Sequence, residues 1–149
     1  MKKGDICCEV GCHLGTSTVL VDEAARYEDA SVTTGGCVGL DIGPSIIRSA
    51  KKKYPNVFFE VGNGFQTGNI ARLTEKHLGK NSSGMLDVIY VDIGGLSGPE
   101  GLLESVSLLS SLTNGLEPRC IVIKSLCVRR LASCLVPFSD VWREMKLQE

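Results

Sequence analysis

The chain has 149 residues, a formal net charge of −1 at pH 7 and a hydrophobic content of 43%. This length predicts a single domain with a sizeable core, and the small net charge excludes a global field that would attract nucleic acid or an anionic membrane. No apolar run approaches the ~20 residues that span a bilayer, and the N-terminal residues lack the apolar segment of a secretory signal. We therefore expect an intracellular protein, cytoplasmic or organellar, without membrane contact.

The seven cysteines agree with this compartment. Their number is odd and no Cys-x-x-Cys pair occurs, which is not the pattern of a secreted disulfide framework. Most lie in apolar, strand-like segments, where cysteine packs as a small hydrophobic residue. A zinc site built from Cys8, Cys12 and His13 is an alternative, but we expect reduced cysteines and no metal.

Short apolar segments alternate with helical patterns along the chain. Strands are predicted at Ile6–Val10, Cys37–Asp41, Val57–Val61, Leu86–Ile93 and Cys120–Lys124. Most are continuous apolar runs, which is typical of parallel strands buried on both faces. Since crossovers between parallel strands are right-handed and cover a face of the sheet, the sequence predicts one α/β domain over residues 1–149 with five strands, mostly parallel.

Helical patterns fill the gaps between these strands. The predicted helices span about 16–29, 44–54, 68–78, 99–112 and 126–136, and residues 138–149 form a short tail. In the first helix Leu20, Ala24 and Tyr27 share the face that is expected to be buried. Asn114 and Gly115 predict the end of the fourth.

The loop after the first strand is the most informative segment. Glu9 lies one residue before the strand ends, Gly11 and Gly15 follow, and Thr16 begins a helix. A strand, a tight turn and a helix N-terminus form the usual cradle for a nucleoside ligand in α/β proteins. The glycine spacing differs from the GxGxxG of dinucleotide folds. We expect Gly11 to let a ligand approach the backbone, so that a larger side chain would abolish binding without unfolding the protein.

Two further loops follow strands at the same edge of the predicted sheet. Asp41 closes the second strand, where a carboxylate can accept both hydroxyls of a ribose. After the third strand, Asn63 lies between Gly62 and Gly64 and is followed by Phe65, which suits the edge and face of a purine. Structural alternatives exist, because Asp41 can cap the next helix and Phe65 can belong to the core.

The order and spacing of these segments resemble the successive motifs of Rossmann-like S-adenosylmethionine (SAM)-dependent methyltransferases over about residues 4–125. The matching segments are Glu9–Gly15, Asp41, Asn63 and residues 87–95. The resemblance implies a three-layer Rossmann-like sheet with strand order 3-2-1-4-5, SAM as cofactor, and methyl transfer to an oxygen or nitrogen acceptor. By the same resemblance, the cofactor-binding residues are Glu9, Gly11, His13, Gly15, Asp41, Ile42, Asn63, Gly64 and Asp92.

Asp92 and Lys124 are the candidate catalytic residues, because each closes one of two strands that should be neighbours. An acid and a lysine beside a sulfonium can orient a nucleophile and help to remove its proton. The pair resembles part of the Lys-Asp-Lys-Glu set of ribose 2′-O-methyltransferases, so RNA is favoured slightly over a small molecule or a protein. The match is incomplete, and a plain ion pair at the strand ends is the alternative.

The C-terminal strands six and seven of the methyltransferase sheet are expected to be missing, since only about 25 residues follow Lys124. The strand at Cys120–Ile123 would then be an edge, which the tail, a second copy or a partner chain would cover. Two functional alternatives stay open: a non-catalytic subunit that binds SAM or a partner, and an NAD-dependent oxidoreductase.

Overall fold

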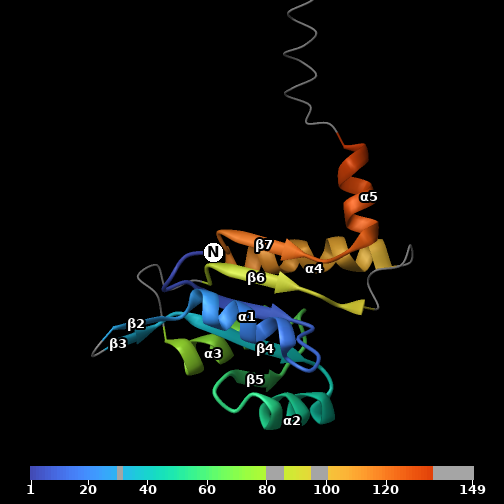
Figure 1. Ribbon diagram of the computed structural model, residues 1–149. Helices are drawn as coiled ribbons and strands as arrows, with labels where there is room; N and C mark the ends of the chain where they lie inside the picture. The colour runs from blue at the N-terminus through green and yellow to red at the C-terminus, as the bar shows by residue number, and fades with distance from the viewer. Residues whose placement is uncertain (30–31, 80–85, 95–100, 136–149) are drawn as a thin grey trace, which may run out of the picture.

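The computed structural model describes residues 1–29, 32–79, 86–94 and 101–135, and its centre is a parallel sheet of five strands (Figure 1). The strands are β1 (Ile6–Val10), β4 (Gly36–Asp41), β5 (Phe58–Val61), β6 (Val88–Val91) and β7 (Cys120–Ile123). They lie in the order β5-β4-β1-β6-β7, and each neighbouring pair is parallel. In chain order this is 3-2-1-4-5, so the predicted α/β fold class and strand order are confirmed.

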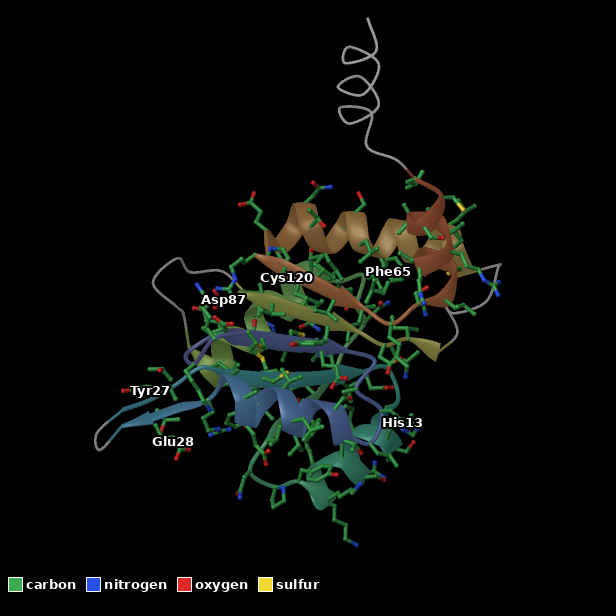
Figure 2. The ribbon with its side chains drawn as sticks, turned by 45° about the horizontal axis from the view of Figure 1, so that its top comes forward. His13, Tyr27, Glu28, Phe65, Asp87 and Cys120 are labelled. Carbon is green, nitrogen blue, oxygen red and sulfur yellow. The ribbon has the colours of Figure 1, made fainter. Side chains whose placement is uncertain are left out.

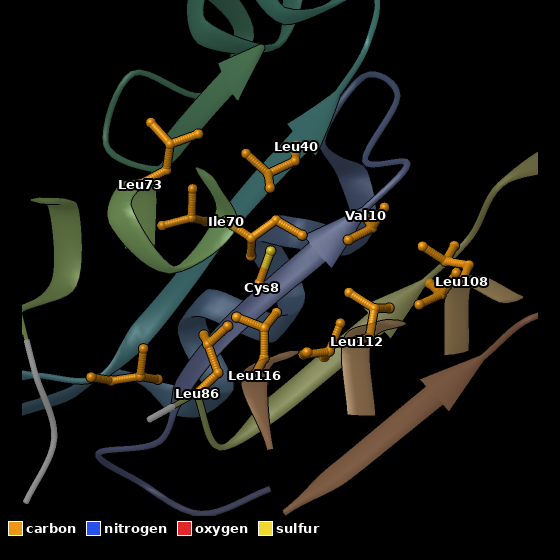
Figure 3. Packing of buried hydrophobic residues seen from close by; sticks show 13 residues of the cluster. Cys8, Val10, Leu40, Ile70, Leu73, Leu86, Leu108, Leu112 and Leu116 are labelled. Carbon is orange, nitrogen blue, oxygen red and sulfur yellow. The ribbon is translucent and has the colours of Figure 1, made fainter. Parts of the chain in front are cut away.

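Helices cover both faces of the sheet and complete three layers. The covering helices are α1 (Thr16–Ala25), α2 (Pro44–Lys53), α3 (Thr67–Leu78) and α4 (Leu102–Leu116), whereas α5 (Leu126–Cys134) follows β7 and contacts α4. On one face, α1 and α2 pack on two small clusters of buried residues. On the other face, α3 and α4 enclose the main core, in which Ile70 and Leu108 pack with Cys8, Val10 and Leu40 of the strands (Figure 3). Within the described ranges, no helix combines the length and the apolar character needed to cross a bilayer.

The first helix ends earlier than predicted. The chain leaves α1 at Ala25 and forms an antiparallel hairpin, β2 (Tyr27–Asp29) with β3 (Val32–Thr34), which the sequence analysis missed. Leu20 is 64% exposed and Tyr27 is 47% exposed. The predicted buried face of this helix is therefore wrong.

Polar side chains take the buried face of α1 because each finds a partner there. Thr18 donates its hydroxyl to the Glu9 carboxylate. Asp22 accepts the backbone N–H of Cys37 at 2.8 Å and pairs with Arg26 at 2.7 Å. Buried polar groups are tolerated when they are hydrogen-bonded, and a pattern of apolar residues alone does not reveal such partners.

The fourth helix runs through the predicted stop. α4 continues to Leu116, and Glu117 then adopts a left-handed backbone with φ of 43°. A Cβ at Gly115 would lie 2.8 Å from the hydroxyl oxygen of Thr67 on α3. Gly115 therefore permits the close approach of two helices and does not end the helix.

Glu60 ties the edge strand β5 to two helices. Its carboxylate oxygens lie 3.3 Å from Nζ of Lys51 on α2, 2.9 Å from Nζ of Lys76 on α3 and 2.7 Å from Nε2 of His77 on α3. The His77 ring also stacks on Phe58, with centroids 4.6 Å apart. Partial burial alone would raise the pKa of Glu60, but the hydrogen bonds from Lys76 and His77 and the charge of Lys51 outweigh it and lower the pKa to about 2.

We expect Glu60→Gln to lower the free energy of unfolding at pH 7 by about 1–2 kcal/mol, a value reduced for the exposure of both lysines. The folded pKa lies below the ordinary glutamate value of 4.5, so the contribution is complete above pH 4.5 and is lost as the pH falls towards 2. Urea unfolding of both proteins at pH 7, 4 and 2.5 measures this. If the difference in unfolding free energy between the two proteins stayed constant from pH 7 to pH 2.5, the lowered pKa of Glu60 would not be the cause.

The outer edge of β7 is open along the described part of the chain. No strand among residues 1–29, 32–79, 86–94 and 101–135 pairs with it. Cys120 is exposed and Val122 is 44% exposed. The tail predicted at 138–149, one of the three covers expected for this strand, lies outside the described residues.

We predict that a second copy of the chain pairs with this edge, because exposed apolar edge strands recruit other chains. Sedimentation at micromolar concentration should then show a dimer or a larger species. Val122→Lys should shift it towards monomer, since an edge lysine opposes strand pairing. Leu20→Lys on α1 introduces the same charge at an exposed position away from β7 and should have no such effect. A monomer at all concentrations would show that the edge is not an interface.

Candidate functional site

A cavity of about 770 Å³ opens at the carboxyl edge of the sheet. The last residues of β1 and β4, the loops after β1, β4, β5 and β6, and the first turn of α4 supply its lining: Val10, Gly11, His13, Asp41, Ile42, Gly62, Asn63, Phe65, Asp92, Ile93, Gly94 and Glu104. Figure 2 shows His13 and Phe65 at the edge to which the strand arrows point, and Asp87 at the opposite edge. The structure thus brings together six of the nine predicted cofactor residues; Glu9, Gly15 and Gly64 do not line the cavity.

Gly11 lines the cavity and also lets the chain pack closely against the backbone of Asp92. Its φ is +86°, and an added Cβ would collide with the carbonyl oxygen of Asp92 on the neighbouring strand segment. The N–H groups of Gly11 and Cys12 both donate to the carbonyl of Leu40, at 2.8 and 2.9 Å. The space beside Gly11 is therefore filled by protein backbone, so the expectation that a larger side chain would leave the fold intact needs correction.

Gly15 and Gly64 also act through packing. A Cβ at Gly15, whose φ is +82°, would collide with the ring of Phe59. A Cβ at Gly64 would meet a methyl group of Val10. Both glycines bring loops close to the sheet, and contact of either with a ligand stays a prediction.

Glu9 fixes the start of α1. The residue is 2% exposed, and its two carboxylate oxygens accept the hydroxyls of Ser17, at 2.5 Å, and of Thr18. These bonds hold the first turn of the helix to the end of β1. Contact of Glu9 with a ligand stays a prediction. A ligand would have to bond to carboxylate oxygens that already accept the hydroxyls of Ser17 and Thr18.

Asp41 presents an oriented carboxylate to the cavity. One oxygen accepts the N–H of His13 at 3.2 Å and the other accepts the N–H of Gly43 at 2.9 Å. His13 has a left-handed backbone with φ of 47°, which turns its N–H towards this carboxylate. The N–H of Gly43 precedes α2, so Asp41 also shapes the entry to that helix. Each oxygen keeps a further lone pair for a ligand hydroxyl.

The wall of the cavity formed by the loops after β4 and β5 combines one amide with two apolar side chains. Asn63 accepts the N–H of Phe65 at 3.0 Å through its side-chain oxygen. Ile42 is 74% exposed and Phe65 is 45% exposed, although both border the cavity. Phe65 is therefore not a core residue. Two exposed apolar surfaces beside an amide suit a flat heterocycle.

Asp92 and Lys124 form an ion pair of 2.9 Å at the ends of the neighbouring strands β6 and β7. Asp92 lines the cavity, whereas Lys124 does not and its side chain is 80% exposed. The hydrogen bond to Asp92 and the charge of that carboxylate raise the pKa of Lys124. Lys124 is therefore kept protonated and is poorly suited to accept a proton.

Glu104 is a cavity residue that the sequence analysis missed. It lies in the first turn of α4 and is exposed. It makes no hydrogen bond or ion pair with another described residue. The signal in the sequence was an acid early in the helix after the fourth strand, which is equally typical of a helix N-terminus.

The alternative zinc site does not assemble. Cys8 and Cys12 are buried and His13 is exposed. Among the described residues, no three His, Cys, Asp or Glu side chains come together in a way that could hold a metal ion.

No protein-family model matches the sequence, nor does any curated protein. Among solved structures, the chain is similar to DesVI of Streptomyces venezuelae, with a TM-score of 0.54 and 15% identity over 82% of this chain and 43% of that one. It is also similar to a TehB-like SAM-dependent methyltransferase of Corynebacterium glutamicum, with a TM-score of 0.53 and 16% identity over 83% of this chain and 55% of that one. The chain thus spans about half the length of these structures, and its fold is the Rossmann-like fold of SAM-dependent methyltransferases.

Proposed function

We propose that this protein binds SAM and catalyses methyl transfer to an oxygen or nitrogen acceptor. One observation carries the proposal: the carboxyl edge gathers Asp41, Asn63 with Phe65, and Asp92 from three strands around one cavity. The same fold in a TehB-like SAM-dependent methyltransferase supports it. Fold alone does not imply activity, so the proposal depends on how the cavity fits the cofactor.

The residues present fit the nucleoside half of SAM. Asp41 would accept the ribose hydroxyls, because backbone donors already orient its carboxylate. Ile42 and Phe65 offer apolar surfaces to the adenine ring, and Asn63 offers an amide to its edge. The loop from Gly11 to His13 lies between this wall and Asp92, where the methionine part would lie.

When bound, SAM supplies a methyl group on a positively charged sulfur. The chain would contribute position and charge: Asp41 holds one end of the ligand, and Asp92 lies at the other end of the cavity, on the far side of β1. Fixing donor and acceptor in line accelerates such a displacement without an acidic or basic group. Lys124 would keep Asp92 in place and would not remove a proton.

A second candidate function is a non-catalytic subunit that binds SAM or a partner chain. The open edge of β7 favours it, because an exposed apolar strand is a ready interface. An NAD-dependent oxidoreductase has less support, since the loop after β1 lacks the glycine spacing of dinucleotide folds.

Calorimetric titration with S-adenosylhomocysteine (SAH), SAM and NAD tests the proposal. We expect SAH and SAM to bind with a stoichiometry of one and NAD to show no binding. Transfer of label from methyl-labelled SAM to RNA, protein and small-molecule fractions of a cell extract then separates an enzyme from a binding subunit. Binding of NAD in preference to SAH would overturn the proposal.

A further inference from the structure

We propose that the surface formed by α2, β5 and α3 binds single-stranded RNA through its phosphate backbone. β5 is the outermost strand at the end of the sheet away from β7, and α2 and α3 lie beside it (Figure 1). We call this surface the β5 face. It carries five exposed cations and one partly buried acid: Arg48, Lys51 and Lys52 of α2, Arg72 and Lys76 of α3, and Glu60 of β5. RNA binding there would require neither SAM nor methyl transfer.

Helical spacing arranges these cations in two rows. The three cations of α2 stand at positions i, i+3 and i+4, so they share one side of that helix. Arg72 and Lys76 are four residues apart and share one side of α3. Lys51 and Lys76 both reach the Glu60 carboxylate, at 3.3 and 2.9 Å, which places one row on each side of β5. The cations therefore converge on one surface.

Most of the positive charge on the β5 face is not balanced within the chain. Arg48, Lys52 and Arg72 form no ion pair with a described residue. Glu60 offers one carboxylate to the two lysines that bond to it. Glu75, the other acid of α3, lines a hollow between α3 and α4, away from these rows. Because the whole chain has a net charge of −1, the surplus is local, and a polyanion is its complementary partner.

A hollow of about 250 Å³ lies beside the cations of the β5 face. Its lining combines two groups able to carry positive charge with apolar side chains: Lys51, His77, Pro55, Val57, Phe58 and Phe59. Unpaired bases of RNA pack against aromatic side chains while their phosphates lie on neighbouring cations. A single strand can place a base in this hollow, whereas a paired duplex keeps its bases stacked inside. Single-stranded RNA therefore matches both the charge and the shape of the surface.

An anionic membrane is a poorer partner for the β5 face. Helices that bind to membrane surfaces insert large apolar side chains next to their cations. The structure describes α2 and α3 throughout, and neither helix exposes a large apolar side chain. Ile47 of α2 and Ile70 and Leu73 of α3 are buried. RNA, which requires cations and a place for a base, fits this surface better.

The test compares two double charge reversals in the full chain. Lys52→Glu with Arg72→Glu changes one cation in each row, and neither residue bonds to Glu60, so the ion pairs that tie β5 to its helices stay intact. Arg129→Glu with Arg130→Glu is the matched control, because both arginines are exposed on α5, which follows β7 at the opposite end of the sheet. Lys52→Gln with Arg72→Gln is a milder variant of the first pair. Thermal unfolding checks that every variant is folded before binding is measured.

The probe is a fluorescent oligouridylate of about 12 nucleotides, followed by anisotropy at several salt concentrations. We expect Lys52→Glu with Arg72→Glu to weaken RNA binding by about tenfold or more. The slope of log K against log salt should fall by about 1.4, since each phosphate contact of a single strand contributes about 0.7. The glutamine pair should weaken binding less, and the α5 pair should change neither quantity. An equal loss in the two charge reversals would overturn the inference. So would tighter binding of the oligouridylate once it is paired with its complement, or capture of the protein by phosphatidylserine vesicles without RNA binding.

Discussion

Asp41→Ala is expected to weaken SAH binding by about 10- to 100-fold, which corresponds to roughly 1.5–3 kcal/mol, the usual range for hydrogen bonds to a charged group. The carboxylate closes β4 at the cavity and is held by the N–H groups of His13 and Gly43. Its removal would take away the proposed acceptor for the ribose hydroxyls and the hydrogen bond that holds the N–H of His13. Isothermal calorimetry measures the loss.

Two further variants separate these effects. Asp41→Asn keeps an oxygen for one backbone donor but removes the charge, so it should lose less affinity than alanine. Glu23→Ala removes an exposed carboxylate from α1, away from the cavity, and should bind SAH normally. Undiminished affinity in Asp41→Ala, in a protein that unfolds at the normal temperature, would show that this acid does not hold the ribose.

Features set by the chain's local pattern could be predicted from the sequence. The five apolar runs gave the strands, and the carboxyl ends of these strands placed Asp41, Asn63 and Asp92 at one edge. This works because parallel strands share a direction, so the residue after each strand lies at the same edge of the sheet. The order 3-2-1-4-5 followed from the resemblance and is confirmed.

Features that depend on a partner distant in sequence could not be predicted. Asp22 is buried because Cys37 and Arg26 complete its hydrogen bonds. His77 stacks on Phe58 and forms an ion pair with Glu60, contacts that the helical pattern at 68–78 does not reveal. In each case tertiary contacts override local propensity, and a single sequence does not reveal which residues will meet.

The charged residues around Asp92 show the same limit of prediction from a single sequence. RNA was the slightly favoured acceptor because Asp92 and Lys124 resemble half of the four-residue set of ribose 2′-O-methyltransferases. In the structure Lys124 does not line the cavity, and its hydrogen bond to Asp92 raises its pKa. Glu104, twelve residues after Asp92, lines the cavity instead. Asp92 and Lys124 could be identified in the sequence, but which charged side chains line the cavity could not.

Gly11→Ala is expected to destabilise the fold by roughly 2–5 kcal/mol, because it combines a left-handed backbone with overpacking. The φ of Gly11 is +86°, and the new Cβ would collide with the carbonyl oxygen of Asp92. At about 2–4 °C per kcal/mol for a chain of this size, thermal unfolding should show a clear drop. Gly11→Val adds more bulk and should be at least as severe.

Gly68→Ala is the matched control, since it adds the same methyl group where nothing lies within 4 Å. Gly68 lies in α3, so alanine there should leave stability unchanged or raise it by up to about 1 kcal/mol. The pair also decides between two explanations of Gly11. If Gly11→Ala lost SAH binding while it unfolded at the normal temperature, the glycine would serve the ligand alone. A loss of stability measured without ligand would show that this position needs glycine so that the chain after β1 can pack against the backbone of Asp92.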